Sequence, residues 1–342
     1  MKKVDLRNFD LAKIICALLV VAIHASPAAG ASNWIYFYVT NVIARIAVPL
    51  FYGMSGYLFF GHLTCENGRI KFCAENRRRL LRQTIRTAAL YFGWSAAYLL
   101  TLQIPNWYRI GWWGSYVVKD YLVSLIFRGS YYHLWYLLAM LYAVPVLYVL
   151  LSVIPVRKVT GVAAVLWLCE CLTYSYSGFG IDQLAPISLI GEKMPIVFDT
   201  LFRALPLLFA GAFLSHHPTA GQCPRWALPL SLLLWVAEAT LLYLHDPESG
   251  RYSYLFSTLP AAYLLLWNLL QSRPVRISTD TCLRMRSLST TVYLIHPMVI
   301  ELLALLEFQE GLLHYCMVAA LSLLLSGLYS LTNQRTHIGK ES

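Results

Sequence analysis

Charged residues are scarce in this chain. Asp, Glu, Lys and Arg together make up 13% of its 342 residues, whereas 58% of the residues are hydrophobic. A soluble domain of this length needs a far more polar surface, so the composition excludes that class. We predict an all-α fold, a polytopic membrane bundle of about ten helices that forms a single domain over residues 1–342. The sequence contains no internal repeat, heptad array or appended soluble domain.

The N-terminus lacks the features of a cleavable signal peptide. The charged lead-in MKKVDLRNFD is followed by an apolar segment that runs past signal-peptide length without a convincing cleavage site. We therefore expect the first helix to remain in the protein as a membrane anchor.

Cysteines are absent from the predicted external loops. The chain has eight, and they lie in predicted cytoplasmic loops (Cys65, Cys73, Cys223 and Cys282) or in predicted spans (Cys16, Cys169, Cys171 and Cys316). Structural disulfides persist in oxidising compartments, so we expect none here. No spacing resembles a zinc site, and we expect no metal.

Ten apolar segments each approach the roughly 20 residues that cross a bilayer. They lie near residues 10–30, 37–60, 87–104, 132–153, 160–177, 196–214, 226–244, 253–271, 287–306 and 311–331. With both termini cytoplasmic, most of the 27 basic residues fall inside, and the external loops hold Arg109, Lys119, Arg128, Lys193 and Arg251. This positive-inside pattern means that the net charge of +10 indicates topology and contact with membrane lipid, not nucleic-acid binding.

The first apolar segment carries two ionisable residues, Lys13 and His24. Eleven residues are about three helical turns, so both side chains fall on one face, with a rise of about 16 Å between them. Ionisable groups inside a membrane segment indicate function by default. The alternatives are a snorkelling Lys13 paired with Asp10 and an interhelical hydrogen bond from His24.

The second segment carries Arg45 and Ser55. In a hairpin with the first segment, Arg45 lies level with His24 and Ser55 level with Lys13. A guanidinium at mid-membrane depth needs a partner or a wet cavity. Gly53 and Gly56 allow close approach of a ligand or of a neighbouring backbone, and plain small-residue helix packing is the alternative interpretation of this stretch.

A basic loop follows, with arginines at Arg78, Arg79, Arg82 and Arg86. Guanidinium groups bind phosphate oxygens well, so this loop is a candidate docking surface for a phosphate-bearing donor. Positive-inside charge and attraction to anionic lipid explain the cluster equally well.

Aromatic residues around His133 and Trp135 begin the fourth span and predict either a sugar-stacking mouth or an interfacial anchor. In the ninth span, His296 precedes Pro297, and a kinked helix with a histidine suits a cavity wall. Helix packing is the alternative for both.

Four further charges lie in spans five to eight: Glu170, Asp199, Arg203 and Glu238. The spacing of four predicts that Asp199 pairs with Arg203. Glu170 and Glu238 have no local partner, so we expect them to neutralise Arg45 or to face a cavity.

Taken together, these motifs resemble the bacterial membrane acyltransferase 3 family. The similar blocks, in the order of that family, are Lys13 with His24, Phe51–Tyr57, the arginines at 77–86, His133–Tyr136 and Tyr293–Pro297. The family more often has Arg where this chain has Lys13, and Lys cannot form the same bidentate phosphate contact. The resemblance covers the whole chain and implies ten helices with both ends inside.

The resemblance implies an O-acyltransferase in the bacterial cytoplasmic membrane. Acyl-CoA, usually acetyl-CoA, would be the cytoplasmic donor, and a hydroxyl of an envelope glycan or lipid-linked sugar would be the acceptor. The family motif carries over to Lys13, His24 and Ser55. An acyl transfer needs a base, for which His24 is suited, and a stabiliser of the oxyanion, for which Arg45 is a candidate. The remaining candidates are Arg78, Arg79, Arg82 and Arg86 for the donor phosphates and His133, Trp135 and His296 for the acceptor.

Two other functions stay open. One is a transporter of a small molecule, an amino acid or a glycan on the same membrane fold, of the type fused to amino-acid racemases, since prolines and intramembrane charges suit broken helices. No racemase domain follows in this sequence, which favours the enzyme. The other is a non-catalytic membrane subunit, which gains nothing from buried charge. The sequence gives no indication of oligomeric state.

Overall fold

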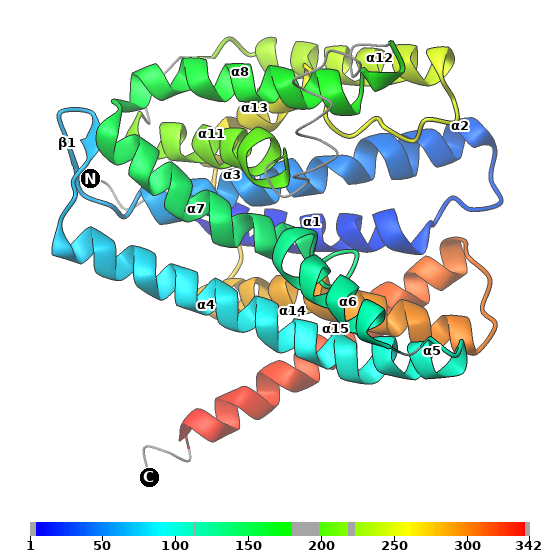
Figure 1. The fold of residues 1–342 in the computed structure, drawn as a ribbon. Coiled ribbons are helices and arrows are strands. Elements are labelled where there is room, and N and C mark those ends of the chain that lie inside the picture. The colour runs from blue at the N-terminus through cyan, green and yellow to red at the C-terminus, as the bar shows by residue number, and fades with distance from the viewer. Residues whose placement is uncertain (1–4, 113, 180–197, 218–222, 339–342) are drawn as a thin grey trace. The chain divides into compact units, whose positions relative to one another are not determined.

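The computed structural model describes residues 5–112, 114–179, 198–217 and 223–338, and nearly all of its regular structure is helical (Figure 1). In that part of the chain, one two-stranded hairpin is the only β structure. The predicted all-α class is thereby confirmed. The chain divides into two compact units, which we call the terminal unit (residues 1–51 and 264–342) and the central unit (residues 52–263).

The terminal unit is built on three long helices. Its elements are α1 (Arg7–Ala25), α2 (Asn33–Tyr36), the π-helix η1 (Phe37–Val42), the 3-10 turn η2 (Ile43–Ile46), α14 (Thr279–Leu305) and α15 (Leu312–Ile338), and it shares α3 (Ala47–Phe60) and α13 (Thr258–Gln271) with the central unit. Helix α14 packs along both α1 and α15. The core between them consists of alanines and valines, which let the helices approach closely, and one leucine: Ala17, Val21, Ala25, Val292, Val299, Leu303 and Val318.

Asn8 fastens the start of α1 to the end of α13. Its buried side-chain amide donates to the carbonyls of Leu269 at 3.0 Å and Ser272 at 3.2 Å, and its Oδ1 accepts from the Val275 amide at 3.0 Å. The last carbonyls of a helix have no partner within the helix, and Asn8 supplies one.

The central unit contains most of the remaining elements. They are β1 (Cys65–Glu66), β2 (Arg69–Ile70), α4 (Ala74–Tyr98), η3 (Leu99–Gln103), α5 (Ile104–Arg109), α6 (Ser115–Phe127), α7 (Trp135–Val153), α8 (Val156–Tyr174), η4 (Ser177–Phe179), η6 (Phe198–Ala204), α11 (Leu205–His216) and α12 (Ala227–His245). Asn67 and Gly68 both have positive φ, which is the requirement of the two-residue hairpin turn between β1 and β2.

Glycines set the contact between α3 and α11. A Cβ on Gly56 would overlap the carbonyl oxygen of Leu208, and one on Gly211 would overlap the carbonyl oxygen of Gly53. The expectation that the glycines of α3 admit a neighbouring backbone is confirmed, and that backbone belongs to α11.

The buried acids of the central unit have distant partners. Glu170, which is 1% exposed, pairs with Arg203 at 2.7 Å, and aromatic rings surround the guanidinium, with Tyr254 nearest at 4.1 Å from its carbon. Glu238 accepts from the Tyr176 hydroxyl at 2.7 Å and the Ser257 amide at 2.9 Å.

The expectation that Glu170 neutralises Arg45 or faces a cavity is therefore wrong, because a guanidinium 33 residues away pairs with it. The same expectation is wrong for Glu238, because its carboxylate accepts hydrogen bonds from the loop before α13. The side chain of Asp199, the expected partner of Arg203, lies outside the described residues.

Six helices of the described chain are long and apolar enough to cross a membrane: Arg7–Ala25, Asn33–Phe60, Trp135–Val153, Ala227–His245, Thr279–Leu305 and Leu312–Ser330. Thr200–His216 is a shorter apolar helix. All seven coincide with predicted spans, which supports a multi-pass membrane protein. The count of ten and the cytoplasmic position of the termini stay predictions.

Candidate functional site

A half-buried histidine of α1 and a fully buried histidine of α14 meet where these two helices pack. The rings of His24 and His296 stack with centroids 5.4 Å apart and an interplanar angle of 27°. His296 is fully buried, and the small core residues of α1 bring the two helices close enough for this contact. Both histidines were predicted site residues, and the terminal unit brings them together.

The proline after His296 fixes the orientation of its ring. Pro297 has no amide hydrogen, so the Tyr293 carbonyl four residues earlier lacks its usual helical donor. The Nδ1 of His296 lies 2.8 Å from that carbonyl oxygen and donates to it. Since a neutral imidazole carries one N–H, Nε2 is then the atom that accepts.

Arg45 belongs to the same cluster. It lies in η2, which packs against α1, and both Arg45 and His296 are within electrostatic range of His24. The Nε of Arg45 is buried and has no hydrogen-bond partner among the described residues. Its segment changes from π-helix to 3-10 geometry, a distortion that is frequent at functional sites. Arg45 and His24 thus lie near one another, while their common depth in the membrane stays a prediction.

A second charged group occupies the other end of α1. The carboxylate of Asp10, which is 3% exposed, accepts from Nε and Nη2 of Arg286, each at 3.0 Å. Lys13 is half-buried and lies within electrostatic range of both. The salt bridge of Asp10 is thus with Arg286, and not with Lys13, which was the alternative interpretation of that lysine.

Arg286 was not among the predicted site residues. It counted only as one of the basic residues near the cytoplasmic surface, and its partner lies 276 residues away along the chain. The acidic residue at the start of the first apolar segment, Asp10, was the available indication that a basic partner exists.

Ser55 lies in the part of α3 that belongs to the central unit and is half-buried. Lys13 belongs to the terminal unit, so their predicted common level stays a prediction. The neighbouring Gly56 is required by the close contact of α3 with α11, which leaves no room for a Cβ.

The basic segment forms the first turns of α4. Arg78, Arg82 and Arg86 are exposed and spaced by four, so they form one stripe along the helix. Arg79 is turned toward Glu75, with Nη2 and Oε1 2.9 Å apart. This stripe is available to anionic groups, while its joint action with Lys13 stays a prediction.

His133 and Trp135 have structural surroundings in the central unit. His133 is 2% exposed and packs edge-on against Tyr98, with centroids 5.0 Å apart. Trp135 lies beside the guanidinium of Arg203, 5.2 Å from ring centroid to carbon. Their contact with an acceptor stays a prediction. Among the described residues, no three His, Cys, Asp or Glu side chains are grouped as a metal site would require.

The chain is similar to several proteins named as racemases. Two proteins of Enterococcus faecalis named amino-acid racemase are 26% and 23% identical to the chain, over 93% and 98% of its length. A serine/alanine racemase of Enterococcus gallinarum is 27% identical over 93% of the chain. These alignments cover 44%, 47% and 45% of the relatives, so the chain spans about half of their length.

No solved structure matches the chain. The acyltransferase domain family matches residues 6–331, which include the whole histidine cluster and the arginine stripe of α4. The chain therefore belongs to the membrane acyltransferase 3 family, as its motifs predicted.

Proposed function

We propose that this chain is an O-acyltransferase of the bacterial cytoplasmic membrane. It moves an acyl group, acetyl in the simplest case, from cytoplasmic acyl-CoA to a hydroxyl of an envelope glycan or lipid-linked sugar. The observation that carries the proposal is the cluster of His24, His296 and Arg45 inside a chain whose family match runs over residues 6–331.

The reaction needs one proton to move twice. His24 takes the proton of the acceptor hydroxyl while its oxygen attacks the carbonyl carbon of the thioester. The C–O bond forms, the C–S bond breaks, and the departing thiolate of coenzyme A receives that proton from His24. Arg45 lies in range of His24 and stabilises the negative charge that develops on the carbonyl oxygen.

His296 acts through His24 as a positioning residue. Its ring stacks on His24, and its own orientation is set by the hydrogen bond to the Tyr293 carbonyl. Because the His296 ring is fixed, the His24 ring stacked on it is already oriented. His24 therefore loses less conformational entropy when the acceptor hydroxyl binds.

Basic residues bind the donor. Lys13 and Arg286 flank the Asp10 carboxylate at the start of α1, and the stripe of Arg78, Arg82 and Arg86 runs along α4. Arginine forks suit the phosphates of coenzyme A, and Lys13 adds a point charge.

Mass spectrometry of envelope glycans tests this function. Cells that express the chain are expected to carry an acylated sugar that is absent from cells without it and from cells with His24→Ala at equal protein level. Identical glycan profiles in the three strains would refute the proposal.

A carrier of amino acids is the second candidate, because the three relatives are named as amino-acid or serine/alanine racemases and the chain matches only part of each. Proteoliposomes that accumulate radiolabelled serine or alanine without any acyl donor would favour it. Unchanged serine and alanine uptake relative to empty liposomes would exclude it.

A further inference from the structure

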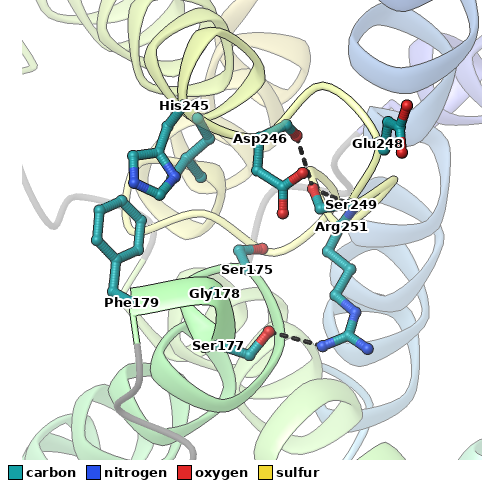
Figure 2. Close-up of a pocket in the computed structure, with 10 residues that line it drawn as sticks. Ser175, Ser177, Gly178, Phe179, His245, Asp246, Glu248, Ser249 and Arg251 are labelled. Carbon is teal, nitrogen blue, oxygen red and sulfur yellow. Dashed lines mark hydrogen bonds between the residues drawn. The ribbon is translucent and has the colours of Figure 1, made fainter.

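A polar pocket lies in the central unit, where α8 and α12 end (Figure 2). Its volume is about 410 Å³, within the range of small-molecule sites. One wall comes from residues 175–179, after α8, and the other from residues 242–251, at the end of α12 and in its following loop. None of these residues takes part in the histidine cluster or in the arginine stripe of α4.

Ser175 brings an unsatisfied hydroxyl to this pocket. The residue is 8% exposed, and its Oγ has no hydrogen-bond partner among the described residues. A buried hydroxyl without a partner is unfavourable, so such groups in folded proteins indicate a missing ligand or water. Because Ser175 lines the pocket, a rotation about its Cα–Cβ bond would let a polar molecule bound there satisfy the hydroxyl.

Asp246 supplies an acceptor on the opposite wall. Its main-chain carbonyl oxygen accepts from Ser249 Oγ and from the Tyr252 hydroxyl, which fixes the loop. Its carboxylate forms no ion pair among the described residues, and Figure 2 shows it turned toward the side of the pocket that holds Ser175. A carboxylate can accept several hydrogen bonds from hydroxyl groups at once.

Arg251 adds donors on the Ser177 side. One of its terminal nitrogens donates to Ser177 Oγ at 2.6 Å, and Ser177 Oγ in turn donates to the Tyr174 carbonyl at 3.0 Å. A guanidinium has five N–H groups, so further donors remain for a ligand.

An aromatic pair borders the polar groups. The rings of Phe179 and His245 stack with centroids 4.2 Å apart, and Phe179 keeps 49% of its surface exposed beside the pocket. The negative face of an aromatic ring attracts the slightly positive C–H groups of a ligand. The pocket thus combines a stacking surface with hydroxyl, carboxylate and guanidinium groups.

We propose that this pocket binds a neutral sugar residue of the acceptor glycan. A pyranose ring offers both a C–H face for Phe179 and hydroxyl groups for Ser175, Asp246 and Arg251. A zwitterionic amino acid matches the charges of Asp246, Glu248 and Arg251, but it offers no C–H ring face to Phe179 and so uses less of the pocket. This inference rests on the proposed function, which supplies a glycan as the second substrate.

The position of the pocket agrees with the predicted topology. That topology places the C-terminal ends of segments 160–177 and 226–244 outside the cell, and helices α8 and α12 both end at the pocket. A glycan of the envelope would reach the protein from that side.

Sugar binding is measured with the purified full-length chain in detergent and without acyl donor, by saturation-transfer NMR with N-acetylglucosamine trisaccharide as the probe. Wild type is expected to bind. Asp246→Asn is expected to raise Kd about tenfold or more, because a charge-assisted hydrogen bond is lost, and Phe179→Ala at least about threefold.

Two matched controls lie on α6 in the same unit. Asp120→Asn removes an exposed carboxylate that is paired with Arg128, and Phe127→Ala removes a ring that is 48% exposed. Both are expected to bind the trisaccharide as wild type does.

Three results would overturn the sugar site: no binding by wild type, equal binding by the pocket variants, or displacement of the probe by serine. Because the measurement contains no acyl donor, it is independent of the transfer reaction. Loss of binding in Asp246→Asn together with unacylated glycans in wild-type cells would leave the pocket in place and refute the proposed function alone.

Discussion

The side chain of His296 replaces a hydrogen bond that Pro297 removes from α14. This single exchange connects backbone chemistry to the candidate site, since the ring that bonds the Tyr293 carbonyl is also the ring that stacks on His24. In the sequence, neither His296 nor Pro297 alone indicates this hydrogen bond. A histidine followed by a proline inside an apolar helix does indicate it.

We predict that Pro297→Ala lowers acyl transfer several-fold without lowering the unfolding temperature. The new amide hydrogen competes for the Tyr293 carbonyl and releases the His296 ring, while a proline inside a helix is itself destabilising. Pro145→Ala, which changes the internal proline of α7, is the control and should leave the transfer rate unchanged. Equal rates in all three proteins would contradict the positioning role of His296.

The Asp10–Arg286 pair permits a prediction of stability. Asp10→Asn is expected to lower the free energy of unfolding by about 1–2 kcal/mol, since the carboxylate is buried but the Arg286 side chain is 50% exposed and screened by solvent. Denaturation in detergent measures this. The exposed Asp280–Arg284 pair on the same helix is the control, and Asp280→Asn should cost less than about 0.5 kcal/mol. Similar losses for both variants would show that the Asp10–Arg286 pair stabilises the protein no more than an exposed ion pair does.

At the scale of elements, residue spacing within one helix was predictable, and contacts between helices were less so. The helical period placed Lys13 and His24 on one continuous helix, α1. The assumption that the first two apolar segments form an antiparallel hairpin placed Arg45 near His24. The partners of Glu170 and Asp10 were missed, because they lie 33 and 276 residues away, and hydrophobic patterns carry no information about pairing at such separations. The π and 3-10 segments before α3 also left no recognisable pattern in the sequence.

The α3–α11 contact gives a prediction at this scale. Gly211→Ala is expected to destabilise the protein strongly or prevent its folding, since the added Cβ meets the backbone of α3 and not a movable side chain. Gly161→Ala in α8 is the matched control because nothing lies within 4 Å of its added Cβ. That variant should gain about 0.5–1 kcal/mol from helix propensity alone. Opposite signs of the two effects on unfolding temperature are expected, and equal signs would contradict the close contact.

At the scale of the whole molecule, the candidate machinery is divided between the two units. The histidine cluster belongs to the terminal unit, and the arginine stripe and the polar pocket belong to the central unit, while the family match covers both. Membrane class and family were predictable because composition and short motifs carry them. The pocket was not, since Ser175 and Asp246 are ordinary loop residues until the fold brings them together.

The residues proposed to bind the donor come from both units, and one residue of each unit is tested by its own variant. Coenzyme A at about 100 times its Kd is expected to stabilise the wild-type chain by about 2.7 kcal/mol through mass action. Lys13→Ala and Arg82→Ala, one from each unit, should each reduce the accompanying rise in unfolding temperature. Arg109→Ala, from a predicted external loop, should leave it unchanged. An equal rise in all four proteins would exclude these residues from donor binding.

The most direct test of the acyltransferase account is the rate at which the purified chain, in lipid with an acceptor glycan, releases coenzyme A thiol from acetyl-CoA. The account predicts that His24→Ala loses about 100-fold or more of that rate, as removal of a general base does. His216→Ala, which changes a half-buried histidine of α11, should retain it. A wild-type rate in His24→Ala, at equal protein level, would contradict the central claim that His24 is the base.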